Sequence, residues 1–198
     1  EINPSRFKGD DLPVEAVSWY DAVEFCKRLS KHTNHEFRLP TEAEWEYACR
    51  AGTKTSFHFG DSITGEQVNC DCQKSVVISE GWLGFGRKTE RIGIYRKRTT
   101  AIGSFPANAF GLYDMHGNVW EWCTDYWHKS YVGAPTNAPT DGSAWIRGGD
   151  SSTRVLRGGS WKFNPRFCRS AFRISSTPAD RPYGVGFRVS CSAPRTLA

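Results

Sequence analysis

The first amphipathic repeat in the chain follows an extended, polar stretch at residues 3–17. Ser18 and Asp21 have the spacing of a helix capping box. The apolar positions that follow recur at the helical period: Ala22, Phe25, Cys26 and Leu29. The pattern predicts a helix with one buried face, on which Cys26 is a small, inert core residue.

A second helix is predicted after Arg38. Thr41 and Glu44 form another capping box, and Gly52 stands where a helix usually ends. The inner face of this helix is expected at Trp45, Ala48 and Cys49. The three glutamates of its first turns are spread around the helix axis, so they do not predict a shared metal.

The rest of the pattern predicts short strands within abundant irregular structure. Residues 53–100 lack periodicity, and residues 128–153 are rich in Gly, Pro, Ser and Thr. The predicted strands are residues 101–105, 112–122 (half-buried) and 186–189. No internal repeat or linker divides the chain, so we expect one α+β domain over residues 1–198.

Composition narrows the class of protein. Apolar residues make up 38% of the 198 residues, and no apolar run approaches 18 residues, so no membrane span is expected. The chain begins at Glu1 and its single methionine is Met115, which favours a fragment or a processed product. Seven cysteines without regular spacing favour a reducing compartment, and we expect a cytoplasmic protein.

Charge leaves a second class of partner open. The net charge is +5, and basic residues gather at Arg87-Lys88, Arg91 and Arg96-Lys97-Arg98. A solvated loop is the commoner explanation of such a cluster. A nucleic-acid-binding module that uses Arg87 to Arg98 remains an alternative.

Three long motifs carry a resemblance to a known family. They are Arg38–Trp45, Gly111–Trp122 and Arg157–Trp161 with Gly186–Arg188. In order and spacing they resemble the formylglycine-generating enzyme (sulfatase-modifying factor) family over nearly the whole chain. The resemblance implies the family's variant of the C-type lectin fold, with two helices, short strands and much irregular structure. The family's usual N-terminal strands would precede Glu1.

Enzymes of that family oxidise a substrate cysteine to formylglycine with copper held by two thiolates, five residues apart. The second thiolate position matches Cys168, but the first falls on Phe163. A phenyl ring cannot ligate copper, which needs paired soft ligands as Cu(I). We therefore expect no copper and no enzyme of this kind, while an oxidoreductase with an altered metal site remains an alternative.

A second resemblance is to the variable proteins of diversity-generating retroelements, found in bacteria. In these, error-prone reverse transcription at template adenines rewrites the C-terminal end of a domain with this fold. Their constant positions match Arg157–Trp161, Pro165, Cys168–Ala171, Arg173, Pro178, Arg181 and Gly186–Val189. The residues between them, within a segment of about 162–184, are the implied variable positions: Phe163, Asn164, Arg166, Phe167, Phe172, Ile174, Ser175, Ser176, Ala179, Asp180, Pro182, Tyr183 and Gly184.

The variable positions imply a non-enzymatic surface that binds an unknown ligand, expected to be a protein. Adenine substitution in asparagine codons cannot produce Lys, Gln, Glu, Met or Trp, and no variable position holds one of these. Lys162 breaks this rule and is a doubtful variable position. Aromatic residues and arginine dominate interface hot spots. The alternative, that the three phenylalanines are core residues, remains open.

Residues 114–121 resemble a calcium loop of the family enzymes. By position, Asp114 and Glu121 would supply side-chain oxygens, and Gly117 and Val119 backbone carbonyls. Hard oxygen ligands from a turn are what Ca²⁺ prefers. Two expectations stay open: a bound Ca²⁺, or a motif kept for folding alone.

Overall fold

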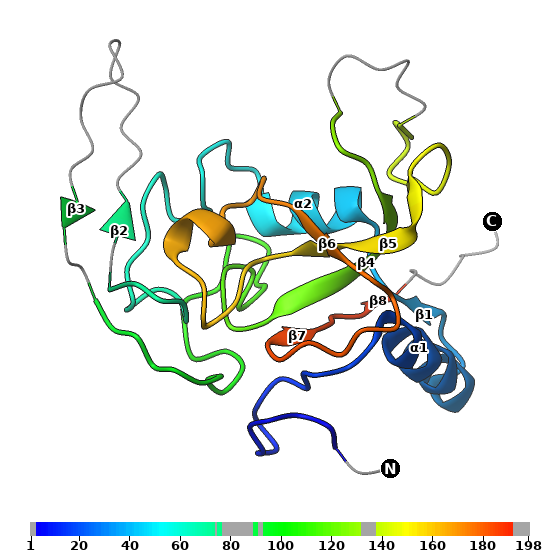
Figure 1. Cartoon of the computed structure of the whole chain (residues 1–198), viewed down its shortest axis with the longest axis horizontal. Helices are drawn as coiled ribbons and strands as arrows, with labels where there is room; N and C mark the ends of the chain where they lie inside the picture. The colour runs from blue at the N-terminus through cyan, green and yellow to red at the C-terminus, as the bar shows by residue number, and fades with distance from the viewer. Residues whose placement is uncertain (1–2, 74, 77–88, 91–92, 132–137, 192–198) are drawn as a thin grey trace.

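The computed structural model describes residues 3–73, 75–76, 89–90, 93–131 and 138–191. A four-stranded sheet with strand order β6-β5-β4-β7 lies at its centre (Figure 1). The strands are β4 (Trp120–Trp127), β5 (Asp150–Arg157), β6 (Ile174–Ser176) and β7 (Val185–Gly186). The pairs β4–β5 and β5–β6 are antiparallel, whereas β7 runs parallel to β4.

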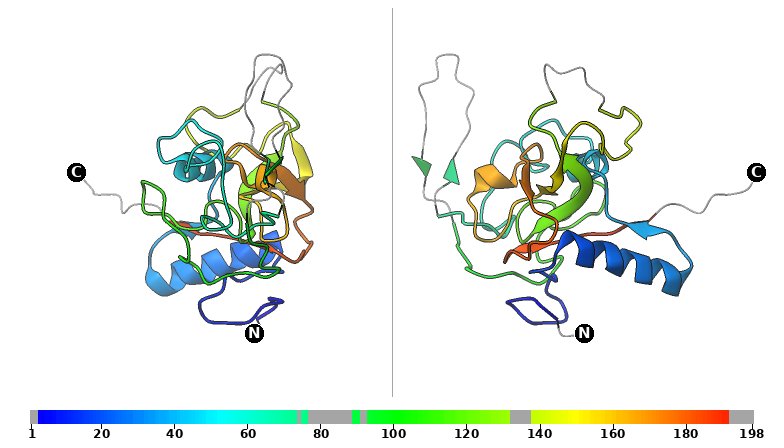
Figure 2. Two further views of the ribbon diagram at one scale, coloured as in Figure 1. Left: turned by 90° about the vertical axis from the view of Figure 1, so that its left-hand side faces the viewer. Right: turned by 45° about the vertical axis from the view of Figure 1, so that its right-hand side comes forward.

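Two small antiparallel pairs and a short 3-10 helix complete the described structure. The pairs are β1 (Phe37–Arg38) with β8 (Ser190–Cys191), and β2 (Ser75–Val76) with β3 (Thr89–Glu90). The 3-10 helix η1 spans Pro165–Cys168. It stands at the end of the sheet nearer to β2 and β3, away from helix α1 (Trp19–Thr33; Figure 2).

Both predicted helices are confirmed with their capping boxes. Helix α1 spans Trp19–Thr33 and helix α2 spans Glu42–Arg50. In each box the N-cap hydroxyl accepts the backbone N–H three residues on, and the carboxylate there accepts the N-cap N–H in return. The end of α2 differs from the prediction, because Ala51 takes the left-handed cap conformation (φ 44°) one residue before Gly52.

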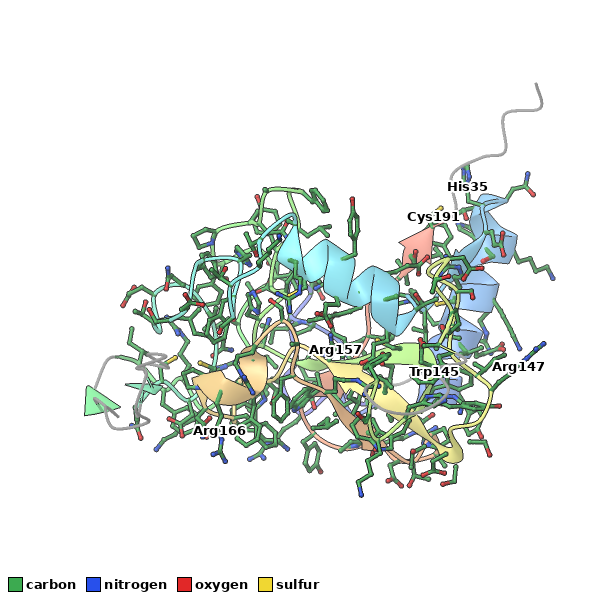
Figure 3. All side chains as sticks on the ribbon, turned by 90° about the horizontal axis from the view of Figure 1, so that it is seen from above. His35, Trp145, Arg147, Arg157, Arg166 and Cys191 are labelled. Atoms are coloured by element: carbon green, nitrogen blue, oxygen red, sulfur yellow. The ribbon has the colours of Figure 1, made fainter. Side chains whose placement is uncertain are left out.

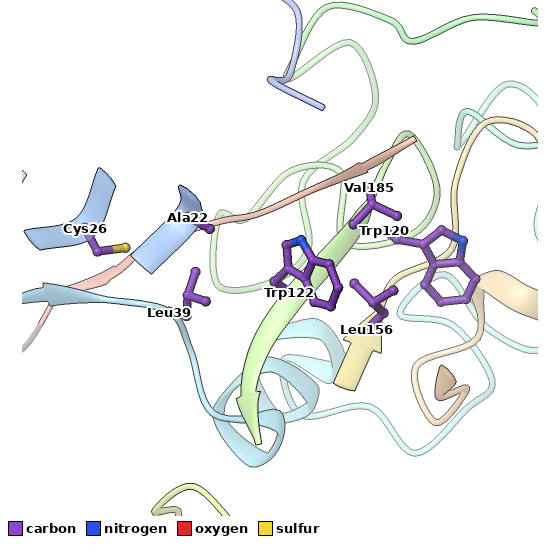
Figure 4. Packing of buried hydrophobic residues seen from close by; sticks show 7 residues of the cluster. All are labelled: Ala22, Cys26, Leu39, Trp120, Trp122, Leu156 and Val185. Carbon is purple, nitrogen blue, oxygen red and sulfur yellow. The ribbon is translucent and has the colours of Figure 1, made fainter. Parts of the chain in front are cut away.

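The helices cover opposite faces of the sheet. On one side, Ala22 and Cys26 of α1 pack with Trp120, Trp122 and Leu156 (Figure 4). On the other side, Trp45 and Cys49 of α2 pack with Cys123 and Val155. Alternate residues of β4 and β5 therefore enter different cores, and neither face of the sheet is left to water. Among the described residues, no helix is long and apolar enough to cross a membrane.

Phe25 departs from the predicted inner face of α1. Ala22 and Cys26 are buried as expected, but Phe25 is 49% exposed and meets the ring of Phe187 edge-on at 5.3 Å. Its position lies at the margin of the apolar face. The loop before β8 covers that margin only in part.

The predicted strands needed correction. The segment 112–122 is not a half-buried strand, since β4 begins only at Trp120 and residues 115–123 are all buried. Asp114, Gly117 and Asn118 before it have φ values of 57°, 85° and 62°, which a strand cannot contain. Sandwiching between two helices explains the burial of both faces.

Two other predicted strands and one irregular segment also differ. Residues 101–105 form a turn, in which Ile102 donates to the Asp11 carbonyl and Gly103 to Asp114. The 186–189 strand is divided, because β7 ends at Gly186 and β8 begins at Ser190 in a different sheet. Strand β5 was missed, because its first residues are exposed and polar and continue the composition of the preceding loop.

Candidate ligand-binding surface

The segment with the variable positions is closed into a loop by Arg157, at the end of β5. Its side chain is fully buried and donates to the carbonyls of Ser170 (2.8 Å) and Phe172 (2.6 Å). The same guanidinium pairs with Glu46 and lies 3.4 Å from Glu42, both on α2. Arg157, labelled in Figure 3, thus fixes the middle of the segment to the end of β5.

The two glycines after Arg157 allow the chain to turn beneath η1. Gly158 and Gly159 have φ values of 95° and 80°. A Cβ atom on Gly159 would lie 2.4 Å from the Sγ atom of Cys168 and 2.9 Å from its Cα atom. Only glycine combines this backbone with so close a neighbour. The contact places η1 directly on the turn.

Constant and variable positions differ in burial. Ten constant positions are buried: Arg157–Trp161, Pro165, Cys168, Ser170, Pro178 and Gly186. Four variable positions are exposed: Arg166, Ala179, Asp180 and Tyr183. The other variable positions except Gly184 are half-buried. The separation is incomplete, since the constant Ala171, Arg181 and Val189 are exposed.

Gly184 is the variable position that the structure removes from the surface. It is buried, its N–H donates to Glu15 (2.8 Å), and its carbonyl accepts the N–H of Trp120 (2.8 Å). A side chain there would point at Ser160 and Trp161. With φ at 78°, the residue serves the turn into β7 and does not face a ligand.

The three phenylalanines of the variable positions are neither plain core nor plain surface. Phe163 meets Phe167 at 5.4 Å and Phe167 meets Phe172 at 5.0 Å, each edge-on. Beneath them lies the buried Trp120, 5.7 Å from Phe163. All three rings pack against the core below α1 yet stay half-exposed. They form an aromatic floor for this part of the surface.

Arg173 is a second anchor in the middle of the segment, next to Phe172, and was not recognised as an anchor from sequence. Its guanidinium forms two hydrogen bonds to Glu42, at 2.5 and 2.7 Å. It lies between the rings of Trp127 and Tyr131, 4.7 and 4.4 Å from their centroids. Burial, followed by the charge of Glu42, raises the pKa of Tyr131. The sequence did contain a signal for this role, because Arg173 matches one of the constant positions of the variable proteins.

The copper position does not fit copper. Phe163 offers only carbon, and Cys168 is fully buried beside Cys70 and Cys72, whose Sγ atoms are 2.7 Å apart. Hydrogen bonding to Cys168 raises the pKa of Cys70, so its thiol keeps its proton. In the described part of the chain, no group of three or more His, Cys, Asp or Glu is arranged to hold a metal ion.

Two histidines support this thiol cluster from the side of α2. The rings of His58 and His116 stack at 4.9 Å. Burial lowers the pKa of His116 to about 3, so the ring is neutral at physiological pH. Its Nε2 atom accepts the N–H of His58 (3.1 Å), and its Nδ1 atom lies 2.7 Å from the carbonyl oxygen of Cys168. The histidine therefore holds η1 in place by a hydrogen bond.

The four predicted calcium positions line one cavity of about 530 Å³. Asp114 accepts the N–H of Gly103 (2.8 Å), and burial raises the pKa of its carboxyl group. Glu121 binds Arg188 through both oxygens (2.6 and 2.7 Å) and also accepts from Trp45 (2.6 Å). The oxygen donors fit a hard cation in kind, but Arg188 already neutralises one carboxylate.

The predicted basic cluster lies only partly within the described residues. Arg87, Lys88 and Arg91 fall outside them. Arg96 packs over Phe105, 5.1 Å from the ring centroid. Lys97 and Arg98 are exposed.

Comparison with known proteins begins with the sequence. A family model described as a sulfatase-modifying factor enzyme 1-like domain matches residues 2–193. The formylglycine-generating enzyme of Mus musculus is 35% identical over 191 residues, which cover 91% of this chain and 44% of the mouse protein. The chain thus spans less than half the length of that relative.

Two solved structures share the architecture. PvdO from Pseudomonas aeruginosa is 34% identical with a TM-score of 0.74, over 95% of this chain and 65% of that one. Treponema denticola variable protein 1 is 28% identical with a TM-score of 0.67, over 96% of this chain and 77% of that one. These likenesses confirm both resemblances seen in the sequence and the C-type-lectin-like fold that they implied.

Proposed function

This chain belongs to the sulfatase-modifying factor enzyme 1-like domain family, and we propose that it is a non-enzymatic, ligand-binding member of it. The proposed binding surface is formed by the variable positions other than Gly184. In this proposal the surface is diversified by a retroelement, and its ligand is a protein.

The separation of burial along the segment supports the proposal most directly. Diversification is compatible with folding only if the altered side chains carry little of the core. Here the buried anchors are constant positions, and the variable positions other than Gly184 are exposed or half-buried. The aromatic floor with Arg166 beside it offers the residue types that dominate protein interfaces. The likeness to Treponema denticola variable protein 1 agrees with this role.

The second candidate function is that of an enzyme, which the 35% sequence identity to the mouse formylglycine-generating enzyme favours. Phe163 in the first thiolate position and the burial of Cys168 speak against it. A direct assay separates the two. The full chain, loaded with Cu(I) and given oxygen and a cysteine-containing peptide, should leave the peptide mass unchanged. The mouse enzyme serves as the positive control, and peptide oxidation by this chain would overturn the proposal.

Diversification has its own genetic test. The 3′ end of the gene should align with a nearby repeat in which the differences fall at template adenines. Within this segment the differences should concentrate at codons for the variable positions. Differences scattered across other bases, or no repeat, would rule out the retroelement.

We further propose that the cavity at residues 114–121 holds Ca²⁺ weakly, as a structural ion. Asp114, Glu121 and Arg188 together give the cavity one net negative charge. The affinity of a site for Ca²⁺ decreases as the negative charge of its ligands decreases. For a dissociation constant of about 1 mM, 10 mM Ca²⁺ should stabilise the fold by about 1.4 kcal/mol.

Calcium at 10 mM is therefore expected to raise the melting temperature by about 3–5 °C. The Asp114→Asn variant should lose this rise, because it removes one of the two carboxylates. Asp141→Asn is the matched control, since Asp141 is exposed and bonded locally to Ser143. Differential scanning calorimetry with and without chelator measures the shift. An equal shift in Asp114→Asn and wild type would contradict the proposal.

A further inference from the structure

Four exposed cations lie beside the variable positions, on three separate segments. They are Arg6, Lys97, Arg98 and Lys162, here called the cationic flank. Arg6 lies over the rings of Phe7 (5.5 Å) and Tyr183 (5.6 Å), and Arg98 over Phe7 (5.5 Å). The ammonium group of Lys162 donates to the carbonyl of Tyr183 (2.8 Å). Through Tyr183, the flank is continuous with the variable positions.

Aromatic rings hold the flank in one piece. Trp161 lies between two of them, meeting Phe7 edge-on at 5.7 Å and stacking with Tyr95 at 6.4 Å. Lys97 in turn lies 5.9 Å from the Tyr95 centroid. Because Trp161 belongs to the constant positions, the ring contacts of Trp161 with Phe7 and Tyr95 do not depend on the variable ones.

A buried carboxylate ties the N-terminal part of the flank to the variable segment. Glu15 is fully buried and accepts backbone N–H groups from Arg6 through one oxygen and Gly184 through the other. The backbone N–H of Glu15 in turn donates to the hydroxyl of Ser5 (3.0 Å). These hydrogen bonds fix the backbone of Arg6 next to Tyr183.

Among the described residues, the flank lacks the carboxylate partner that several of the chain's other arginines have. Arg38, Arg50, Arg157, Arg173, Arg181 and Arg188 each pair with a carboxylate. Within the described residues, no carboxylate lies at ion-pair distance from a member of the flank. Four unpaired cations in one place favour an anionic partner.

We propose that the cationic flank is a constant part of the binding surface and receives an acidic segment of a protein partner. The inference rests on the proposed function, whose ligand it places in a chemical class. Three members lie outside the variable segment, and Lys162 is a residue that adenine substitution of asparagine codons cannot produce. The flank supplies attraction and fast association, while the variable positions supply specificity.

A protein fits this surface better than a single-stranded nucleic acid. Binding of such strands relies on free aromatic faces on which bases stack. Here Trp161 is only 7% exposed, and Phe7 and Tyr95 are half-buried. Tyr183 is exposed, but Arg6 already lies over its ring.

The test uses the full chain and two labelled polyanions: a poly-glutamate peptide of about 20 residues and an oligothymidylate of equal charge. Fluorescence anisotropy is measured at low and physiological salt. The flank variant combines Arg6→Gln, Lys97→Gln and Arg98→Gln. The matched control combines Lys27→Gln, Lys31→Gln and Lys54→Gln, three exposed lysines elsewhere. Circular dichroism and melting verify that both variants fold.

The flank variant is expected to bind poly-glutamate about tenfold more weakly, equivalent to about 1.4 kcal/mol, and the control less than about twofold. Equal weakening in both variants would reduce the effect to net charge and overturn the inference. Tighter binding of the oligothymidylate than of the peptide would overturn it in favour of a nucleic acid. So would no peptide binding at low salt. None of these outcomes touches the adenine-repeat or peptide-oxidation tests, which judge the proposed function separately.

Discussion

Gly159→Ala is expected to lower the free energy of unfolding by about 2–5 kcal/mol. Left-handed backbone costs an alanine about 1–2 kcal/mol, and forcing extra volume into a packed site costs about 1–3 more. The new Cβ atom would lie 2.4 Å from the Sγ atom of Cys168, which is fully buried and cannot move aside freely. Urea denaturation followed by tryptophan fluorescence measures the loss.

Gly142→Ala separates the clash from the backbone strain. Gly142 has the same φ of 80° as Gly159, but a Cβ atom there would meet nothing within 4 Å. Gly142→Ala should therefore lower the free energy of unfolding only by the cost of the backbone strain, about 1–2 kcal/mol. If both variants lost the same amount, η1 would not be packed on the glycine turn as described.

Arg157→Met is expected to destabilise the fold by about 3–5 kcal/mol, because it removes one of the two guanidinium groups beside the buried Glu42 carboxylate and the donor of two backbone carbonyls. Glu42 keeps Arg173, but Glu46 is left with Arg50 alone. The carbonyls of Ser170 and Phe172 also lose their donor. Hydrogen exchange should accordingly quicken across residues 170–173, which denaturation alone would not reveal.

Arg28→Met is the matched control. Arg28 pairs with Glu24 one turn earlier on α1, and both side chains are more than half exposed. Exposed pairs of this spacing contribute about 0.3–0.5 kcal/mol. A comparable loss in Arg157→Met and Arg28→Met would mean that Arg157 does not anchor the segment of variable positions.

Local patterns were enough to predict the parts of the fold that depend on neighbouring residues. The boxes Ser18–Asp21 and Thr41–Glu44 placed both helices, because capping is completed within one turn. Motif order and spacing indicated the family and the fold, which the comparisons confirm.

Predictions failed where a residue's role depends on distant segments. Residues 101–105 were predicted to form a strand, but they form a turn that is held by hydrogen bonds to Asp11 and Asp114. Gly184 was expected on the binding surface, but it is buried and its N–H donates to Glu15, which is distant in sequence. The alternation in β4 predicted one solvent-exposed face of the strand. Helices α1 and α2 cover both faces, and no local pattern in the sequence shows this.

The sequence by itself determined the two helices and the family, and its resemblance to variable proteins implied the division of residues 157–189 into constant and variable positions. It also located the missing thiolate at Phe163. Only the tertiary structure decided which of those positions face outward and that Cys168 is enclosed with Cys70 and Cys72. It also decided that the cationic flank gathers on Phe7, Tyr95 and Tyr183. The physical reason is that burial and charge pairing are properties of segments far apart in the chain, which no local pattern records.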